Sequence, residues 1–358
     1  MQIFMFQRSV FNRNKLGFFV FSHMFLKSIY AVSLVILLLG CSFNKLDPAK
    51  QAPTFTIQVQ NFDSAFFAMD TLHTAVAVQK LIQTYPNFAV DYFSKILMLN
   101  GQKDSLAIKA FYKAYLPIYK DAQKLNALAL AKSEMENGFR HLHYYFPKYP
   151  LTHKVVGFIG PLESYGNIVM KDGLAVGLQM YLGANSDWYY SERIQTIYPA
   201  YMSRRFTPAY IAVNSVQNIL NDIVPPSNKN LSLISQMIEE GKRQYIINAC
   251  FPETPDTIRF GYTALQMNEL EKQESKIWEY VLHSKLSFST NPVDIQNMMQ
   301  ESLYSDVFGE LVPGNVGKYI GYKIVAKWMQ LKPQKSISME ALLQTTPDEI
   351  FTEASYAP

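Results

Sequence analysis

The sequence is poor in cysteine and has no excess of glycine or proline. Its 358 residues include 2 cysteines, 16 glycines and 18 prolines. No residue type forms a run and no segment recurs at a fixed spacing, which excludes collagen-like, low-complexity and solenoid chains. With 49% hydrophobic and 17% charged residues, the composition predicts a globular body of one large or two small domains.

Most of the chain also lacks an excess of either charge. The formal net charge is +4, but the first forty residues hold four of the 33 basic side chains and none of the 29 acidic ones. The rest of the chain therefore carries 29 of each sign. A surface that binds nucleic acid needs extra positive charge for the phosphates. We therefore expect no nucleic acid partner.

One uncharged, largely apolar run lies near the N-terminus. Residues 29–39 follow Lys27 and precede Gly40 and Cys41, and this length and these flanks are typical of a signal peptide. A transmembrane helix needs about 20 apolar residues, and extending the run backwards would place Lys27 inside the bilayer. Residues 1–40 are therefore predicted to be a signal peptide, for which Met24 is an alternative start.

The Leu-Leu-Gly-Cys ending of this run resembles a bacterial lipobox, in which the signal is cut before the cysteine and that cysteine is lipidated. Cys41 is then the first residue of the mature protein. Acyl chains such as palmitate, when several are attached, hold a protein stably on a membrane. The alternative is that Cys41 is a buried or free thiol. Once Cys41 is acylated, Cys250 is left without a cysteine partner, so no intramolecular disulfide can form.

A short tether follows the lipidated cysteine. Residues 41–55 contain two prolines among polar side chains, and as a flexible coil they would reach on the order of 20 Å. Ser42 is not an acidic retention residue of the kind known in some bacteria. We therefore expect a membrane-anchored lipoprotein of the cell envelope, in the outer membrane and facing the periplasm.

The remaining residues, 56–358, have mainly helical periodicity. Alternation in residues 56–62 predicts a strand, and runs rich in Val, Ile, Met and Tyr predict a small central sheet at residues 154–159, 167–171 and 174–182. Apolar residues three and four apart predict helices over residues 74–84, 88–99, 105–116, 122–145, 189–198, 208–223, 231–247, 263–282 and 316–329. The expected fold is α+β and mainly helical, with an N-terminal helical part (56–150) followed by the sheet and the C-terminal helices (151–358).

The sequence lacks the zinc peptidase signature His-Glu-x-x-His. Five histidines follow the signal peptide, and His141 and His143 lie two residues apart, so they point to different sides of a helix and favour a structural role over a metal site. Cys250 has apolar neighbours, which favours a buried inert thiol over a nucleophile. We expect no catalytic metal and no cofactor.

Two features of the C-terminal half bear on packing and function. Residues 313–321 carry glycines three and four apart but match neither a dinucleotide-binding motif nor a P-loop. On a helix beginning at Val316, Gly317 and Gly321 share one face, which predicts close helix packing. Glu240 falls beside the buried stripe of its own helix, whereas Glu239 is expected to point to solvent. A hydrated carboxylate is the usual interpretation of Glu240, and a functional role is the alternative.

An ordered set of segments then resembles a known family. The segments are Gly-Leu-Gln-Met-Tyr-Leu-Gly (177–183), Ile-Glu-Glu-Gly-Lys (238–242), Glu-Ser-Lys-Ile-Trp-Glu-Tyr (274–280) and the stretch 313–325. Together with the lipobox and the Ser-Tyr-Ala-Pro ending, they resemble the GldB family of gliding-motility lipoproteins. The resemblance covers roughly residues 146–358 and is carried by the order of the motifs rather than by any single one.

That family is similar in turn to predicted zinc peptidases, in which a helix with His-Glu-x-x-His precedes a helix with Glu-Gly. Here the second helix keeps Glu240 and Gly241, but residues 208–223 contain no histidine. A lone carboxylate cannot hold zinc. The resemblance therefore implies a degenerate zincin-like architecture, a pseudoenzyme without metal.

The candidate remnant cleft comprises Glu240, Gly241, Lys242, Gly317, Gly321 and Lys323. We expect Glu240 to be at least partly buried and close to the turn at 313–321. A buried carboxylate without a metal needs a cation or must be protonated, so Lys242, Lys318 or Lys323 is expected to pair with Glu240.

The resemblance implies a non-catalytic, membrane-anchored envelope lipoprotein that supports gliding motility or type IX secretion and has protein partners in that machinery. Two alternatives come from other classes. A solute-binding lipoprotein could line a pocket with the 14% aromatic residues, although such residues are more often core. A metal-independent hydrolase would need a nucleophile and its base, and the sequence shows no Gly-x-Ser-x-Gly elbow.

Overall fold

The computed structural model describes residues 52–358, apart from residue 172 and segments 227–229 and 333–336. Ala52–Pro358 forms one compact unit. The predicted signal peptide, Cys41 and most of the tether lie outside the described residues. Within the described part, no helix is both long and apolar enough to cross a membrane.

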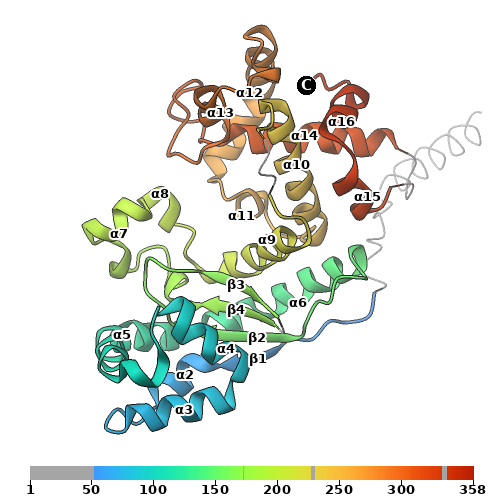
Figure 1. Cartoon of the computed structure of the whole chain (residues 1–358). Helices are drawn as coiled ribbons and strands as arrows, with labels where there is room; N and C mark the ends of the chain where they lie inside the picture. Colours follow the sequence, from blue (N-terminus) through green and yellow to red (C-terminus); the bar gives the residue numbers. More distant parts are fainter. Residues whose placement is uncertain (1–51, 172, 227–229, 333–336) are drawn as a thin grey trace, which may run out of the picture. The chain divides into compact units, whose positions relative to one another are not determined.

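A four-stranded mixed sheet lies in the middle of this unit (Figure 1). Its strands are β1 (Gln58–Asn61), β2 (Lys154–Phe158), β3 (Asn167–Met170) and β4 (Gly173–Gly177), in the order β1-β2-β4-β3. β1 pairs with β2 and β2 with β4 in parallel, whereas β3 and β4 are antiparallel. All five residues of β4 are buried, as expected for a central strand covered on both faces. The predicted sheet is confirmed, and β1 ties the start of the body to it.

The predicted strand 174–182 is too long at its C-terminal end. β4 ends at Gly177, and a 3-10 helix, η4 (Leu178–Met180), follows. An added Cβ at Gly177 would lie 2.5 Å from the carbonyl oxygen of Tyr165. The backbone is thus crowded where the strand ends, and the apolar residues beyond it are buried in a helical turn.

Most of the N-terminal helices pack on one side of the sheet around aromatic rings. They are α2 (Phe62–Phe67), α3 (Thr74–Thr84), α4 (Pro86–Asp91), the π-helical η2 (Tyr92–Ile96), η3 (Gly101–Asp104) and α5 (Ser105–Leu125). The last one, α6 (Ala127–Tyr145), packs instead against helices of the second half. The rings of Phe62 and Tyr92 lie 4.7 Å apart, centroid to centroid, and those of Phe66 and Tyr92 5.5 Å. Aromatic pairs at such distances stabilise a core beyond their burial alone.

Several helix boundaries differ from the predicted ones, as at the junction of α5 and α6 and in the predicted helix 88–99, which is α4 followed by η2 and ends at Ile96. α5 continues through Pro117 to Leu125, and Asn126 then adopts a left-handed conformation with φ 50°. The chain therefore breaks between α5 and α6, where the periodicity predicts one helix over 122–145. Asparagine tolerates this conformation better than most residues, and the apolar pattern continues across the break.

The second half is almost entirely helical. Its elements are η5 (Asp187–Tyr189), α7 (Glu192–Ile197), α8 (Ala200–Ser203), η6 (Pro208–Tyr210), α9 (Ile211–Ile223), α10 (Leu233–Cys250), α11 (Asp256–Phe260), α12 (Ala264–His283), η7 (Leu286–Phe288), α13 (Pro292–Met299), α14 (Val316–Leu331), α15 (Met339–Gln344) and α16 (Pro347–Ala354). α9 packs against both β3 and α6 and so joins this half to the sheet. The prediction of a mainly helical α+β fold is confirmed.

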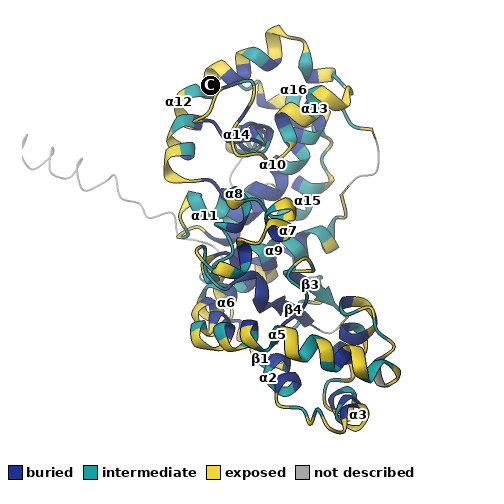
Figure 2. Ribbon diagram, turned by 90° about the vertical axis from the view of Figure 1, so that its left-hand side faces the viewer, coloured by how far each residue is buried: buried dark blue, intermediate teal, exposed yellow. Residues whose placement is uncertain are grey.

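α10 and α14 form the central helix pair of this half, and their facing residues are buried (Figure 2). At Gly241, an added Cβ would lie 2.2 Å from the carbonyl carbon of Gly321. At Gly321, it would lie 1.7 Å from the carbonyl oxygen of Met237. No side chain fits at either position, so the predicted close packing of glycines is confirmed and joins two helices that lie about eighty positions apart in the sequence.

Candidate functional site

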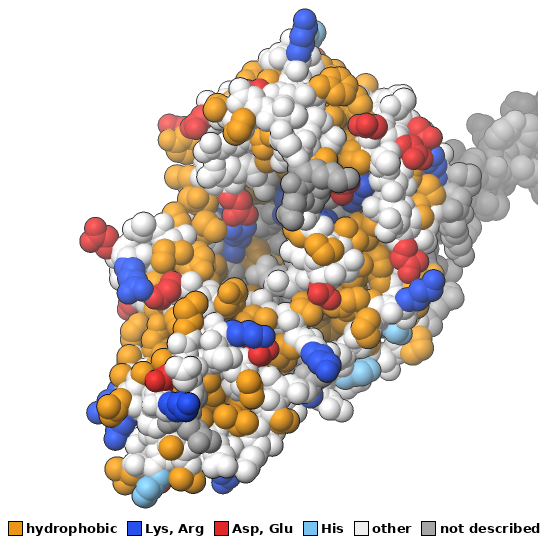
Figure 3. Space-filling model, in the orientation of Figure 1, with side chains coloured by type: hydrophobic (Ala, Val, Ile, Leu, Met, Phe, Trp, Pro, Cys, Tyr) orange, Lys and Arg blue, Asp and Glu red, His pale blue; other side chains and the backbone are white. Residues whose placement is uncertain are grey.

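Beside this crossing lies a polar cavity of about 310 Å³. Its walls come from the segment after α8, from η6 and α9, from α10, from α11, and from residues before and at the start of α14. The lining residues are Arg205, Phe206, Tyr210, Val213, Asn214, Gln217, Glu240, Ile247, Ile258, Arg259, Phe260, Gly261, Glu301, Asn315 and Lys318. Acidic and basic side chains also lie next to each other inside the hollow of the face shown in Figure 3.

One wall is fixed by a two-point ion pair. The guanidinium of Arg205 donates to both carboxylate oxygens of Glu301, at 3.0 and 2.6 Å. Partial burial would raise the pKa of Glu301, but the hydrogen bonds and charge of Arg205 lower it below its ordinary value. Arg205 and Glu301 therefore neutralise each other, and a bidentate pair of this kind also fixes orientation.

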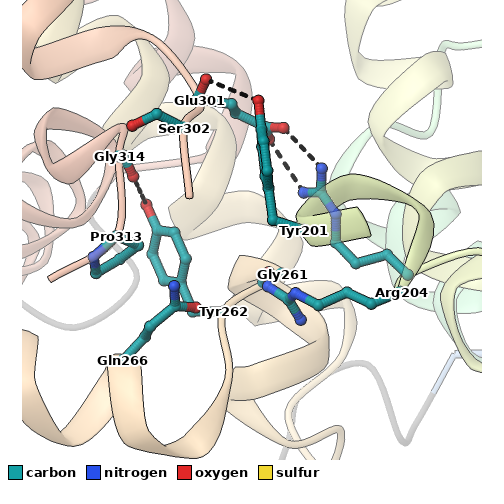
Figure 4. Close-up of a pocket in the computed structure, with 10 residues that line it drawn as sticks. Tyr201, Arg204, Gly261, Tyr262, Gln266, Glu301, Ser302, Pro313 and Gly314 are labelled. Atoms are coloured by element: carbon teal, nitrogen blue, oxygen red, sulfur yellow. Dashed lines mark hydrogen bonds and ion pairs between the residues drawn. The ribbon is translucent and has the colours of Figure 1, made fainter. Parts of the chain in front are cut away.

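Figure 4 shows the small hollow beside the cavity, which shares Arg205, Gly261 and Glu301 with it. Tyr262 closes it by donating its hydroxyl to the carbonyl oxygen of Asn315 at 2.8 Å. Arg204 donates to the carbonyl oxygen of Gly261 at 2.5 Å. These bonds join α8, α11 and the start of α14, so two side chains hold the loops around the cavity by donating to backbone carbonyl oxygens.

Lys318 lies in the first turn of α14 and extends into the cavity. Its Nζ donates weakly to the carbonyl oxygen of Phe260 at 3.3 Å and lies 5.9 Å from the centroid of the Phe260 ring. Burial lowers the pKa of Lys318, although Glu301 and Glu240 act in the opposite direction. Among the described carboxylates, none lies within 4.0 Å of this ammonium. Lys318 is thus a cation without a direct ion-pair partner.

Glu240, on α10, faces Lys318 from the other helix of the pair. It is partly buried and lines both this cavity and a second one of about 690 Å³. Within the part of the chain that the structure describes, its carboxylate accepts no hydrogen bond and forms no ion pair. The cavity therefore contains two opposite charges on neighbouring helices, and neither is in direct contact with the other.

Amide side chains complete the polar lining. Oδ1 of Asn315 is buried and has no hydrogen-bond partner. Asn214 donates to the hydroxyl of Tyr181 at 3.1 Å, and Gln217 donates to Oδ1 of Asn221 at 3.3 Å. A buried carbonyl oxygen without a donor costs about 1–3 kcal/mol. Oδ1 of Asn315 is thus a desolvated acceptor at the edge of the cavity.

The structure brings some of the predicted cleft residues together and places others elsewhere. Glu240 is partly buried and lines the cavity with Asn315 and Lys318, so its expected proximity to the 313–321 turn is confirmed. Its expected contact with a lysine is not present, because Lys318 faces it without an ion pair. Gly241 and Gly321 lie in the contact between α10 and α14 and do not line the cavity.

Gly317 also belongs to the helix contact, where an added Cβ would lie 3.0 Å from Cγ of Met237. Lys323 instead forms an ion pair with Glu274 at 3.1 Å.

Lys242 and Glu239 require a correction. Lys242 is buried, and its Nζ donates to Oε1 of Glu239 at 2.7 Å and to the carbonyl oxygen of Thr345 at 2.6 Å. Glu239 therefore does not simply point to solvent, and its side chain is 28% exposed. Lys242 does not line the cavity. Helical phase alone missed this because the C-terminal segment covers the side of α10 that carries Lys242.

Arg205, Glu301, Asn214 and Gln217 were not predicted as site residues. Arg205 and Glu301 are 96 residues apart, and nothing in a single sequence marks them as a pair. The available signal was on α9, the helix that precedes Glu240 in the sequence and contributes Asn214 and Gln217 to the cavity.

The structure gives no donor set for zinc. Within residues 52–358, gaps excepted, no group of three or more His, Cys, Asp or Glu side chains could hold a metal ion. The cavity itself offers two carboxylates, and one of them is bound by Arg205. His141 lies buried with Nδ1 2.8 Å from the carbonyl oxygen of Asn137. Cys250 is buried as predicted, and burial raises the pKa of its thiol.

Comparison with known proteins agrees with the resemblance of the motifs. A family model described as gliding motility protein GldB matches residues 44–358, nearly the whole chain. The match extends through the N-terminal helices, which carry little that is specific in the sequence. Searches of curated proteins and of solved structures found no match.

Proposed function

Since this chain belongs to the family of the gliding motility protein GldB, we propose that it supports gliding motility, and the associated type IX secretion, by binding rather than by catalysis. It does so as a lipoprotein anchored through Cys41 to the outer membrane, facing the periplasm. Its C-terminal half is a zincin-like scaffold from which the metal ligands have been lost. Its partners are envelope proteins of that machinery.

The observation that carries this proposal is the spacing of cavity residues on α9. In a His-Glu-x-x-His helix, the first and fifth residues bind zinc and the second acts as the base. Val213, Asn214 and Gln217 have this spacing, and all three line the cavity with Glu240 of α10. Valine and glutamine are not zinc ligands of the usual kind, and asparagine is not a base.

What remains suits binding. The Arg205–Glu301 pair fixes one wall, while Glu240, Lys318 and Asn315 present polar atoms that no described residue satisfies in full. None of the lining residues is a serine, threonine or cysteine that could act as a nucleophile. The cavity therefore lacks the hydroxyl and thiol nucleophiles of the common hydrolases, and its polar residues can hold and orient a ligand.

A zinc-restoring double variant tests the scaffold. Val213→His with Gln217→His would place two imidazoles at the i and i+4 positions beside Glu240, and we expect one equivalent of Zn²⁺ by elemental analysis after dialysis. The matched control, Asn218→His with Asp222→His, has the same spacing on α9 outside the cavity and should not gain stoichiometric zinc. Equal zinc in both variants, or none in the first, would contradict a zincin-like site.

The unaltered full chain provides the second half of this test. We expect no stoichiometric metal in it by elemental analysis, and no peptidase activity that is lost on chelation. A peptidase activity that chelator removes, together with one bound metal per chain, would refute a non-catalytic role.

The anchor is tested separately by Cys41→Ser. Loss of the acylated residue should move the protein from the membrane fraction to the soluble fraction in high salt, and gliding should fail although the body is intact. Retention of the variant in the membrane fraction would exclude Cys41 as the anchor. Ser42→Ala is the matched control, and it should fractionate with the unaltered protein.

A further inference from the structure

Glu240 and Lys318 face one cavity from two helices that cannot slide past each other. The Gly241–Gly321 contact leaves no room for adjustment between α10 and α14. The backbones that carry the two residues are therefore held in place. In this arrangement the carboxylate and the ammonium lie farther apart than ion-pair distance, with open space between the walls. An arrangement of this kind leaves both charges partly desolvated and unpaired, which is costly unless something fills the gap.

We propose that the cavity binds a zwitterionic ligand of the amino-acid type, a short peptide with both termini free. Its ammonium pairs with Glu240 and its carboxylate with Lys318. This assignment rests on the proposed function, because it gives the ligand class for a cavity that binds and does not catalyse.

The charge balance of the walls favours a zwitterion over a simple anion or cation. Arg205 is already neutralised by Glu301, and Arg259 forms an ion pair with Asp256. An anion would satisfy Lys318 but leave Glu240 unpaired, and a cation would do the reverse. A ligand with both charges satisfies both residues at once.

The neutral part of the lining suits a peptide as well. Asn214 and Gln217 add amide groups to the lining, and these groups can exchange hydrogen bonds with a peptide unit. Apolar walls contributed by Phe206, Val213, Ile247 and Ile258 can cover a small side chain. The volume of about 310 Å³ lies at the lower end of the range of small-molecule sites and suits a ligand of about two residues.

Blocked and unblocked dipeptides test this directly on the full chain in detergent. Calorimetric titration with dialanine and with phenylalanyl-alanine should detect binding below about 10 mM. Acetylating the amino end or amidating the carboxyl end of the same peptides should weaken binding at least about tenfold, because each block leaves one charge of the protein unpaired.

Variants assign each end of the ligand to its residue. Glu240→Gln should abolish the penalty for N-acetylation and keep the penalty for amidation, and Lys318→Met should do the opposite. Lys318→Arg keeps the charge and should retain binding. This variant keeps the proposal testable if Lys318→Met does not fold. Lys323→Met, on the same helix but outside the cavity, is the matched control and should bind as the unaltered chain does.

Two results would overturn the assignment. One is that no unblocked dipeptide binds up to about 10 mM, and the other is that blocked and unblocked forms bind equally. Neither result depends on the zinc-restoring variant, so the ligand class can fail while the zincin-like scaffold stands. Conversely, peptide binding together with failure of Val213→His and Gln217→His to take up zinc would keep the ligand and reject the scaffold.

Discussion

The N-terminal helices and the α10–α14 pair are stabilised in different ways. α2, α4 and η2 are joined by rings, with Phe62 in contact with Tyr85, Phe88 and Tyr92 at centroid distances of 4.7–5.3 Å. α10 and α14 instead approach so closely that backbone touches backbone at Gly241 and Gly321. In the first region large side chains fill the space between the helices. In the second, glycines leave no side chain between them, so the helix backbones come into contact.

The two regions also differ in what they bury. The aromatic region has few buried polar groups among its described residues, and one of them, Asp63, is ionisable. α10 buries Lys242, Arg243 and Gln244 in succession. Buried polar groups are costly unless they are hydrogen-bonded, and each of these three has protein partners. The candidate site instead involves Glu240 of the same helix, whose carboxylate has no such partner among the described residues.

The largest effect is expected at the helix crossing. Gly321→Ala places a Cβ 1.7 Å from the carbonyl oxygen of Met237, so the helices must separate. Overpacking of a core costs about 1–3 kcal/mol and occasionally more, and a clash with backbone belongs at the upper end. Chemical denaturation should show a loss of at least about 3 kcal/mol or no cooperative transition.

Gly166→Ala is its matched control, because the nearest atoms to the added Cβ there lie at an ordinary 3.6 Å. It should change stability by less than about 1 kcal/mol. Similar losses in the two variants would show that the α10–α14 contact is not specially tight.

Asp63 tests the aromatic region. Burial raises the pKa of its carboxyl to about 6 from 3.8, and Oδ1 has no hydrogen-bond partner. Because the folded pKa is higher than the unfolded one, the folded state holds the proton more tightly between these values. The free energy of unfolding should therefore fall as pH rises from 4 to 7, by up to about 3 kcal/mol.

Asp63→Asn removes this titration and imitates the protonated acid. The variant should match the unaltered chain near pH 4 and exceed it at pH 7.5, as measured by urea unfolding at both values. A difference between the two proteins that does not change with pH would mean that Asp63 is ionised in the folded state without penalty.

A smaller loss is expected from Lys242→Met. Lys242 joins α10 to the C-terminal segment through Glu239 and Thr345, and its side chain is 1% exposed. Because Glu239 is partly in water, the loss should be about 2 kcal/mol, less than for a fully buried pair. Lys124→Met, which breaks an exposed pair with Asp121 on α5, is the control and should cost about 0–1 kcal/mol. Equal losses would mean that burial of Lys242 adds nothing.

Regular packing is what the sequence predicts best. The periodicity of α3 gives its bounds, Thr74–Thr84, without error, and the glycine spacing at 317 and 321 predicts the helix contact. Periodicity averages over several turns, so it passes over a single left-handed residue such as Asn126 and over helices as short as α8.

The site is predicted less well because it depends on distant residues. Glu240 is found from its helical phase, but Arg205 and Glu301 meet only once α8 and α13 have been placed by the rest of the fold. Lys242 has the composition of a solvated residue and becomes buried because α15 and the residues after it cover it. Periodicity reports which face of a helix is apolar, and it does not report what else covers the helix.

The smallest effect is expected from Lys323→Met. This variant tests whether the face of α14 that carries Lys323 is independent of the face that carries Lys318 and lines the cavity. Lys323 forms an ion pair with Glu274 at 3.1 Å, and its side chain is 36% exposed. Glu274 also accepts hydrogen bonds from the hydroxyls of Tyr319, at 3.2 Å, and Tyr356. The carboxylate therefore keeps two donors when the lysine is removed, and the loss should be about 0–1 kcal/mol by urea unfolding. Because Lys323 lies outside the cavity, the affinity for dipeptides should stay unchanged. A fall in affinity would mean that Lys323 belongs to the binding site, as the sequence predicted.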